Sequence, residues 1–190
     1  MGKVVFDISM SLDGFIAGPN DGLDEPLGEG GERLHSWLAA DQTDVEAELF
    51  ESSQRAIGAV ICGRRTYDNS EWIPGYGPAG KTPVFVVTHR TGGDGLREGP
   101  FTLVDGIQSA VKQAQTVAGD KEVSVMGGAD IAAQLLRAGL VDEVVIHLVP
   151  VLLSGGRRLF ANLGPDRIEL RPIEVIGSPR TSHLRFHVVR

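Results

Sequence analysis

The stretch KEVSVMGGADIAAQLLRAG, residues 121–139, runs from one apolar segment through two glycines into another. Residues 123–126 have the composition of a short buried strand. Residues 131–136 carry the buried stripe of a helix. The Gly127-Gly128 pair therefore lies at a strand-to-helix turn, where backbone N–H groups at the positive end of a helix can hold an anion. A tight turn that needs positive φ explains the glycines equally well.

The same alternation of strand and helix patterns runs along the rest of the chain. Helices are predicted at 33–40, 43–54, 63–68 and 106–119, and strands at 3–10, 56–62, 82–89, 101–104 and 142–153. This alternation predicts an α/β fold: a mostly parallel central sheet of about eight strands with helices on both faces. Two closing strands around a Gly-Ser-Pro turn predict a C-terminal antiparallel hairpin. The Gly-, Pro- and Asp-rich segment 11–32 is predicted to be a long loop. We expect one domain over residues 1–190, because no linker or repeat interrupts the pattern.

The composition excludes several classes of protein. The chain has 190 residues, of which 42% are apolar and 23% charged, as in ordinary globular domains. The net charge of −7 argues against a general nucleic-acid or membrane binder. The single cysteine, Cys62, lies in an apolar run and is expected to be a small buried hydrophobe. The histidines and carboxylates lack ligand spacing, so no metal site is expected.

The N-terminal segment lacks the features of a secretory signal, since no basic region precedes a long apolar stretch. No apolar run is long enough to span a bilayer. We therefore expect a cytoplasmic protein whose partner is a small molecule.

The predicted strands end in residues that suit a ligand site. Ligands of open α/β sheets bind at the carboxyl ends of the strands. That rule brings together the loop after Met10, residues 63–66, residues 88–90 and residues 127–130. Because these segments carry glycines, hydroxyls and arginines, the grouping favours a phosphate ligand for the glycine pair.

Several motifs in order resemble one known family. They are SMSLDGFIAG, VICGRRTYD, PVFVVTH, the run from Val123 to Phe160 and the closing residues 181–190. Together they resemble the dihydrofolate reductase-like superfamily, and most closely the RibD C-terminal family, the reductase domain of riboflavin biosynthesis. The resemblance implies NADPH as the cofactor, a stand-alone reductase domain and, from the riboflavin reductases, a homodimer.

The resemblance also implies a cofactor role for particular residues. The pyrophosphate would lie on Gly127, Gly128, Ala129, Asp130 and Ile131, which follow Met126, and the family's glycine–glycine peptide is cis. The remaining contacts would come from Gly63, Arg64, Arg65 and Thr66 at the pyrophosphate and 2′-phosphate, from Thr88, His89 and Arg90 at the adenosine, and from Ile8, Ser9, Ile16 and Ala17 at the nicotinamide. Arginines near the adenosine ribose favour NADP over NAD.

The candidate proton donors are three carboxylates. Classical dihydrofolate reductases carry an acid on the helix that corresponds to residues 43–54, where Glu46 and Glu48 are the candidates. Glu46 is also the expected partner of Thr43 in a capping box. Asp13 is the acidic residue nearest the expected nicotinamide, although an Asp-Gly turn explains it equally well.

Three functions follow as hypotheses. The first is an NADPH-dependent reductase of the riboflavin precursor 5-amino-6-(5-phosphoribosylamino)uracil or of a related heterocycle. The second is a dihydrofolate reductase, and the third is a non-catalytic NADP-binding protein. The zinc deaminase signature of bifunctional riboflavin enzymes is absent from the sequence. Arg157 and Arg158 would suit a substrate phosphate or an edge loop, and His147 is expected to be a core or pocket-wall residue.

Overall fold

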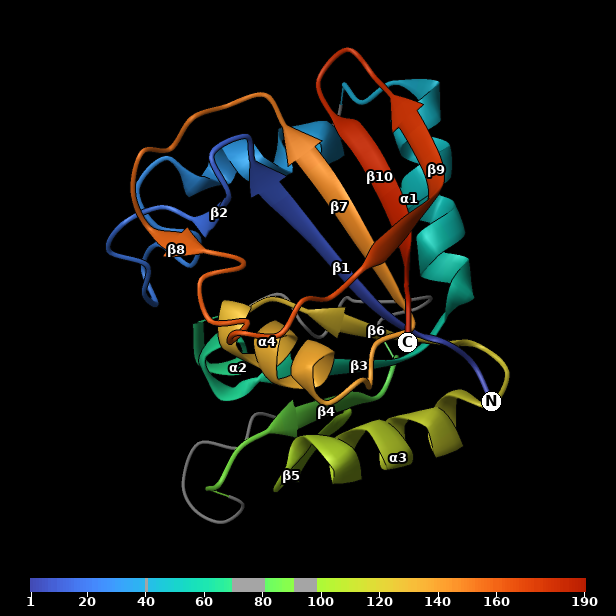
Figure 1. The fold of residues 1–190 in the computed structure, drawn as a ribbon. Helices are drawn as coiled ribbons and strands as arrows, with labels where there is room; N and C mark the ends of the chain where they lie inside the picture. Colours follow the sequence, from blue (N-terminus) through green and yellow to red (C-terminus); the bar gives the residue numbers. More distant parts are fainter. Residues whose placement is uncertain (40, 70–80, 91–98) are drawn as a thin grey trace.

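The computed structural model describes residues 1–39, 41–69, 81–90 and 99–190. Their centre is an eight-stranded sheet with the strand order β5-β4-β3-β6-β1-β7-β10-β9 (Figure 1). Its strands are β1 (Val4–Ser11), β3 (Ile57–Gly63), β4 (Val84–Val87), β5 (Phe101–Val104), β6 (Glu122–Met126), β7 (Glu143–Val149), β9 (Leu170–Gly177) and β10 (Ser182–Val188). All neighbouring pairs from β5 to β7 are parallel, whereas β10 is antiparallel to both β7 and β9. The predicted α/β class and antiparallel C-terminal hairpin are confirmed.

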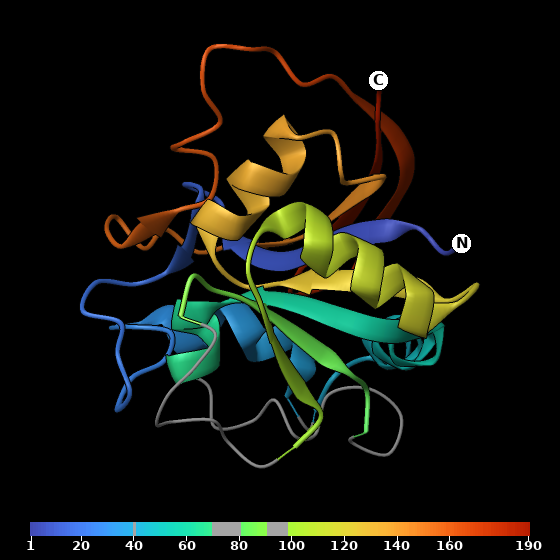
Figure 2. The ribbon, with the colours of Figure 1, turned by 90° about the horizontal axis from the view of Figure 1, so that it is seen from below.

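Helices cover both faces of the sheet (Figure 2). One face is covered by α3 (Ile107–Ala118) and α4 (Ala129–Arg137), and the other by η1 (Gly31–Leu38), α1 (Asp44–Ala56) and α2 (Arg64–Asn69). Strand β3 shows why: Ala59 and Ile61 pack in the core beneath α3 and α4, whereas Val60 and Cys62 pack with Tyr67 of α2. A strand buried on both faces needs an unbroken apolar run, and residues 59–62 supply one.

A second, small sheet was not predicted. Strand β2 (Phe15–Ala17) pairs with β8 (Arg157–Arg158) in an antiparallel ladder. Such short strands show no alternating apolar pattern in the sequence, and β2 falls within the segment predicted to be a loop.

The strand predicted at residues 142–153 is shorter in the structure, because β7 ends just before Pro150.

Within the described ranges, no helix is long and apolar enough to cross a membrane. The same residues contain no group of His, Cys, Asp or Glu that could hold a metal ion.

Candidate active site

A cavity of about 1000 Å³ opens at the carboxyl ends of the central strands. Its wall includes Asp7 and Ile8 of β1, Gly63 at the end of β3 and Met126 at the end of β6. The volume lies at the upper end of the range for ligand pockets, so the space can hold a large cofactor beside a small substrate.

The glycine pair of the quoted stretch lies in the wall of this cavity. Gly127 and Gly128 have φ values of 59° and 67°, in the left-handed region that favours glycine. A Cβ on Gly127 would lie 2.7 Å from Cγ2 and Oγ1 of Thr66. Gly128 precedes α4, and no side chain caps the N-terminus of that helix. Gly127 is therefore required by the close contact with Thr66, and the N-terminus of α4, which no side chain caps, lies in the cavity wall, which fits the pyrophosphate of a dinucleotide.

The expectation of a cis peptide at this turn is wrong. The described part of the chain contains no cis peptide bond. The chain makes the turn instead through positive φ at Gly127 and Gly128, which only glycine adopts at little cost.

Most of the predicted cofactor residues line this one cavity: Ile8, Ser9, Ile16, Ala17, Gly63, Arg64, Arg65, Thr66, Met126, Gly127, Gly128, Ala129, Asp130 and Ile131. Thr88, His89 and Arg90 do not, although Val87 does. The backbone N–H of Thr88 donates to Val104, and the Thr88 hydroxyl accepts from Arg90 N–H. His89 is exposed and contacts Asp105 at 2.8 Å. The structure thus holds this segment at the end of β4, outside the cavity wall.

Asp21, which the sequence analysis did not single out, joins two arginines of the cavity wall. Its Oδ2 accepts from Nε of both Arg65 and Arg157 at 2.9 Å, and its backbone oxygen accepts from Arg65 Nη2 at 2.9 Å. Burial opposes ionisation, but the hydrogen bonds from Arg157 and Arg65 leave the pKa of Asp21 below its ordinary value. The long loop is thereby tied to α2 and β8, and both guanidinium groups are held at the cavity.

Asp13 does not line the cavity. Its carboxylate accepts from the Ser11 hydroxyl at 2.6 Å and from the N–H groups of Leu153 and Ser154 at 3.1 and 2.7 Å. The hydrogen bond from Ser11, followed by those from the two backbone N–H groups, lowers the pKa of Asp13 in spite of some desolvation. Asp13 therefore joins the turn after β1 to the loop after β7, in agreement with the turn interpretation.

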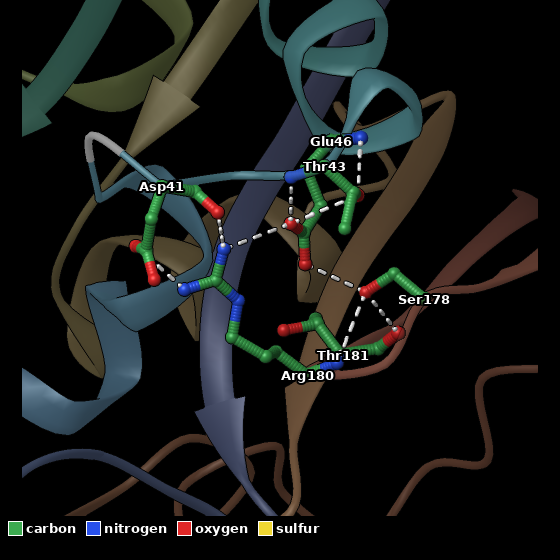
Figure 3. A network of polar contacts seen from close by, with 6 residues as sticks. All are labelled: Asp41, Thr43, Glu46, Ser178, Arg180 and Thr181. Atoms are coloured by element: carbon green, nitrogen blue, oxygen red, sulfur yellow. Dashed lines mark hydrogen bonds and ion pairs between the residues drawn. The ribbon is translucent and has the colours of Figure 1, made fainter.

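Glu46 is buried in a polar network away from the cavity (Figure 3). It completes the predicted capping box, because its carboxylate accepts from Thr43 N–H at 2.8 Å while its own N–H donates to the Thr43 hydroxyl. Its other oxygen, Oε1, accepts from the Ser178 hydroxyl at 2.7 Å, whereas Arg180 Nη2 lies 3.4 Å from Oε2, the oxygen that accepts from Thr43. Burial opposes ionisation, yet the hydrogen bonds from Thr43 and Ser178 bring the pKa of Glu46 below its ordinary value.

The structure also places Glu48 outside the cavity. It pairs with Arg55 on the exposed side of α1 at 3.0 Å. The residues that α1 presents to the cavity are Phe50, Ser53 and Gln54. Neither candidate acid of this helix lies in the cavity wall, because Glu46 caps the helix and Glu48 pairs with Arg55 on its exposed side.

A different carboxylate reaches the cavity, from β1. Asp7 lines the wall, and its Oδ1 lies 2.9 Å from Nε2 of His147 on β7. Nδ1 of His147 lies 2.7 Å from Nδ1 of His183 on β10. Trp37 of η1 covers His147 at a ring distance of 4.3 Å and donates to the Ser9 hydroxyl at 3.0 Å.

The sequence held a signal for this row of side chains. Along β1, the polar residues Asp7, Ser9 and Ser11 alternate with apolar residues. β1 lies in the middle of the sheet, between β6 and β7, and so both of its faces are covered by other parts of the protein. Polar residues on a buried face need partners, which indicates a site or a polar network there. The pairing of β1 with β7 and of β7 with β10 then decides which residues meet, and that order is not visible in a local pattern.

Comparison with known proteins agrees with this geometry. A family model described as the RibD C-terminal domain matches residues 2–179. The chain belongs to the RibD C-terminal domain family. This is a family of NADPH-dependent reductases related in fold to dihydrofolate reductase.

The alignments with known proteins cover nearly the whole chain. The uncharacterized protein YwjB of Bacillus subtilis is 26% identical over 199 residues, which cover 99% of this chain and 98% of YwjB. A crystal structure from Shewanella sp. PV-4, described provisionally as a riboflavin biosynthesis protein, has a TM-score of 0.73 and 26% identity, with 100% of both chains covered. Dihydrofolate reductase from Enterococcus faecalis, solved with NADP(H), has a TM-score of 0.62 at 12% identity, with 98% of this chain and 96% of the enzyme covered, and shares the fold.

Proposed function

We propose that this RibD C-terminal domain protein is an NADPH-dependent reductase of a small heterocyclic or ribosylamino substrate. One observation carries the proposal: the glycine turn before α4 and the Asp7–His147 pair lie in the wall of the same cavity. An anion site and an acid–base pair in one pocket are what a dinucleotide-dependent reduction requires.

The chain would hold the cofactor with its own backbone and two arginines. Gly127, Gly128 and the first turn of α4 would receive the pyrophosphate. Arg64 and Arg65 line the cavity near Thr66 and suit the extra phosphate of NADP. Ile8 and Ile16 would form the apolar wall for the nicotinamide, which excludes water from the reacting atoms. Bound there, NADPH supplies a hydride.

The substrate is proposed from the family and from the arginines of β8. The riboflavin precursor 5-amino-6-(5-phosphoribosylamino)uracil is the family's default substrate and carries a phosphate. Arg157 and Arg158 line the cavity from β8. The Arg158 guanidinium is held at the cavity edge, because it lies over the Phe15 ring at 4.5 Å and its Nη1 donates to the backbone oxygen of Asp13 at 3.2 Å. We therefore favour a phosphorylated substrate.

The dihydrofolate reductase alternative finds no support in α1, because Glu46 and Glu48 lie outside the cavity wall. Methotrexate would nevertheless decide it: a dihydrofolate reductase should gain thermal stability on binding the drug, whereas we expect no shift in Tm. The non-catalytic alternative would be excluded by oxidation of NADPH in the presence of the riboflavin precursor.

The proposal is tested by fluorescence titration with NADPH and, separately, with NADH. We expect NADPH to bind more tightly, and Arg64→Ala to weaken that binding by about tenfold through loss of a charged hydrogen bond. Arg55→Ala is the matched control, because Arg55 pairs with Glu48 and Glu51 on the exposed side of α1. If neither nucleotide binds to the unmodified protein, the proposal is wrong.

A further inference from the structure

The proposed contacts of the cofactor do not include the polar side chains that β1, β7 and η1 present to the cavity. These side chains are Asp7, His147 and Trp37. Behind them, His183 of β10 is buried at 4% exposure. The three titratable side chains form one continuous row from the cavity into the protein interior.

The hydrogen-bond pattern decides which way the protons of this row point. Nε2 of His183 is buried and has no partner in the described part of the chain. An imidazole nitrogen without a proton tolerates that position better than a buried N–H group. We therefore place the proton of His183 on Nδ1, where it donates to Nδ1 of His147. His147 must then carry its own proton on Nε2 and donate it to Asp7.

The surroundings keep His183 neutral. Burial and the neighbouring His147 lower the pKa of His183 to about 4, while Glu46 and Asp7 act in the opposite direction. The charged or titratable groups that face the row are His35 from η1 and Glu46 from α1. A neutral His183 fixes the ring of His147 in one tautomer, as the partner of a catalytic histidine commonly does.

The second carboxylate oxygen of Asp7 is available to a ligand. Oδ1 is held by His147, and Oδ2 has no partner among the described residues. The Asp7 side chain is 21% exposed, and the residue lines the cavity. It directly precedes Ile8, which is expected beside the nicotinamide. A carboxylate oxygen in that position can accept a hydrogen bond from an N–H group of a ligand.

We propose that Asp7, positioned by His147 and His183, binds the nitrogen edge of an amino-substituted heterocycle and exchanges a proton with it. This inference rests on the proposed function and names its catalytic acid. When a carbon–nitrogen double bond is reduced, the carbon takes the hydride and the nitrogen takes one proton. Before the reduction, Oδ2 of Asp7 takes up one proton from water at the mouth of the cavity. It gives this proton to the nitrogen as the carbon takes the hydride, and Asp7 is a carboxylate again afterwards, while His147 keeps its own proton on Nε2 throughout.

The test uses 2-aminopyridine, a small heterocycle whose absorbance differs between its neutral and protonated forms. The full-length protein is titrated with it at a pH about one unit above the probe's own midpoint, since a carboxylate partner favours a cation by about that much. We expect saturable binding of the protonated form. Asp7→Asn keeps the shape but loses the charge, so it should bind about tenfold more weakly and hold the neutral form.

Asp105→Asn is the matched control, because Asp105 also pairs with a histidine, His89, but on the surface outside the cavity. It should bind the probe as the unmodified protein does. The inference is overturned if Asp7→Asn binds the protonated probe as tightly as the unmodified protein, or if the unmodified protein binds no protonated probe.

A parallel NADPH titration separates this result from the proposed function. If NADPH fails to bind to the unmodified protein, the proposed function falls, while the probe still decides the role of Asp7. If NADPH binds to both proteins with the same Kd, Asp7→Asn is folded, and any difference in probe binding reports on the carboxylate itself.

Discussion

A methyl group placed on Gly127 would lie 2.7 Å from two atoms of Thr66. The residues belong to different segments, the turn after β6 and helix α2, so their contact sets how closely these two walls of the cavity approach each other. Gly127→Ala combines this clash with a φ of 59°. We expect a loss of roughly 2–4 kcal/mol in the free energy of unfolding and weaker NADPH binding.

Gly139→Ala separates the two causes of that loss. Gly139 has a φ of 65°, and its added Cβ would meet nothing within 4 Å. It therefore carries the backbone penalty alone, about 1 kcal/mol. Denaturant unfolding of both variants measures the difference. Equal losses would show that the contact with Thr66 does not matter.

Glu46→Gln should destabilise the protein by about 1–3 kcal/mol, because the amide cannot satisfy all the donors that meet the carboxylate. Glu48→Gln on the same helix is the control and should change stability by less than about 0.5 kcal/mol, since Glu48 is exposed. Thermal unfolding at neutral pH measures both variants.

The pH dependence gives the Glu46 prediction a second readout. The pKa of Glu46 is lower in the folded protein than its ordinary value of 4.5. Its contribution is therefore present above pH 4.5 and is lost as the pH falls through the lower folded value. Below that value Glu46→Gln and the unmodified protein should converge in stability. A gap that persists in acid would contradict the prediction.

His183 should destabilise the folded state in a higher pH window. Its pKa is about 4 in the folded protein against an ordinary 6.5, so the unfolded chain binds the extra proton between these values. Stability should therefore fall as the pH drops from about 6.5 to about 4, by up to about 3 kcal/mol. His183→Gln should flatten this part of the stability curve.

His187→Gln, on the same strand, is the control for that experiment. It leaves the His147–His183 contact in place and should keep the slope of the unmodified protein between pH 4 and 6.5. Urea unfolding at several pH values measures the slope. A slope that survives in His183→Gln would assign it to other groups.

The edge strand β9 leads to a prediction about assembly. β9 lies at one end of the sheet, and Ile173 and Val175 are 50% and 66% exposed. An apolar edge strand is a ready site for pairing with another chain. We expect a homodimer by light scattering, and a monomer for Ile173→Asp. Val117→Asp on α3, a position that is 54% exposed, is the control. A monomeric unmodified protein would contradict the expectation.

The apolar strands and the amphipathic helices were predictable because each depends on a local period. β3 and β4 are unbroken apolar runs, β6 contains Val123, Val125 and Met126, and α4 carries a regular buried stripe. The same local rules predicted the Thr43–Glu46 capping box. They could not show that Ser178 and Arg180 would close around Glu46, since those residues come from the loop between β9 and β10.

The candidate site was predictable only in part for the same reason. Glycines and arginines at strand ends follow from the order of elements along the chain, so the glycine turn was found. The row Asp7, His147 and His183 depends on the spatial order β1-β7-β10, which joins segments from both ends of the sequence. Asp21 reaches Arg65 and Arg157 through a loop without a periodic pattern.

The position of His183 on the last strand has a consequence for biosynthesis. The glycine turn and α4 are complete once residue 137 has been made, whereas β10 follows only with residues 182–188. A nascent chain therefore contains the residues of the glycine turn and α4 before it contains His183. The residue that fixes His147 is the last part of the proposed site to be synthesised.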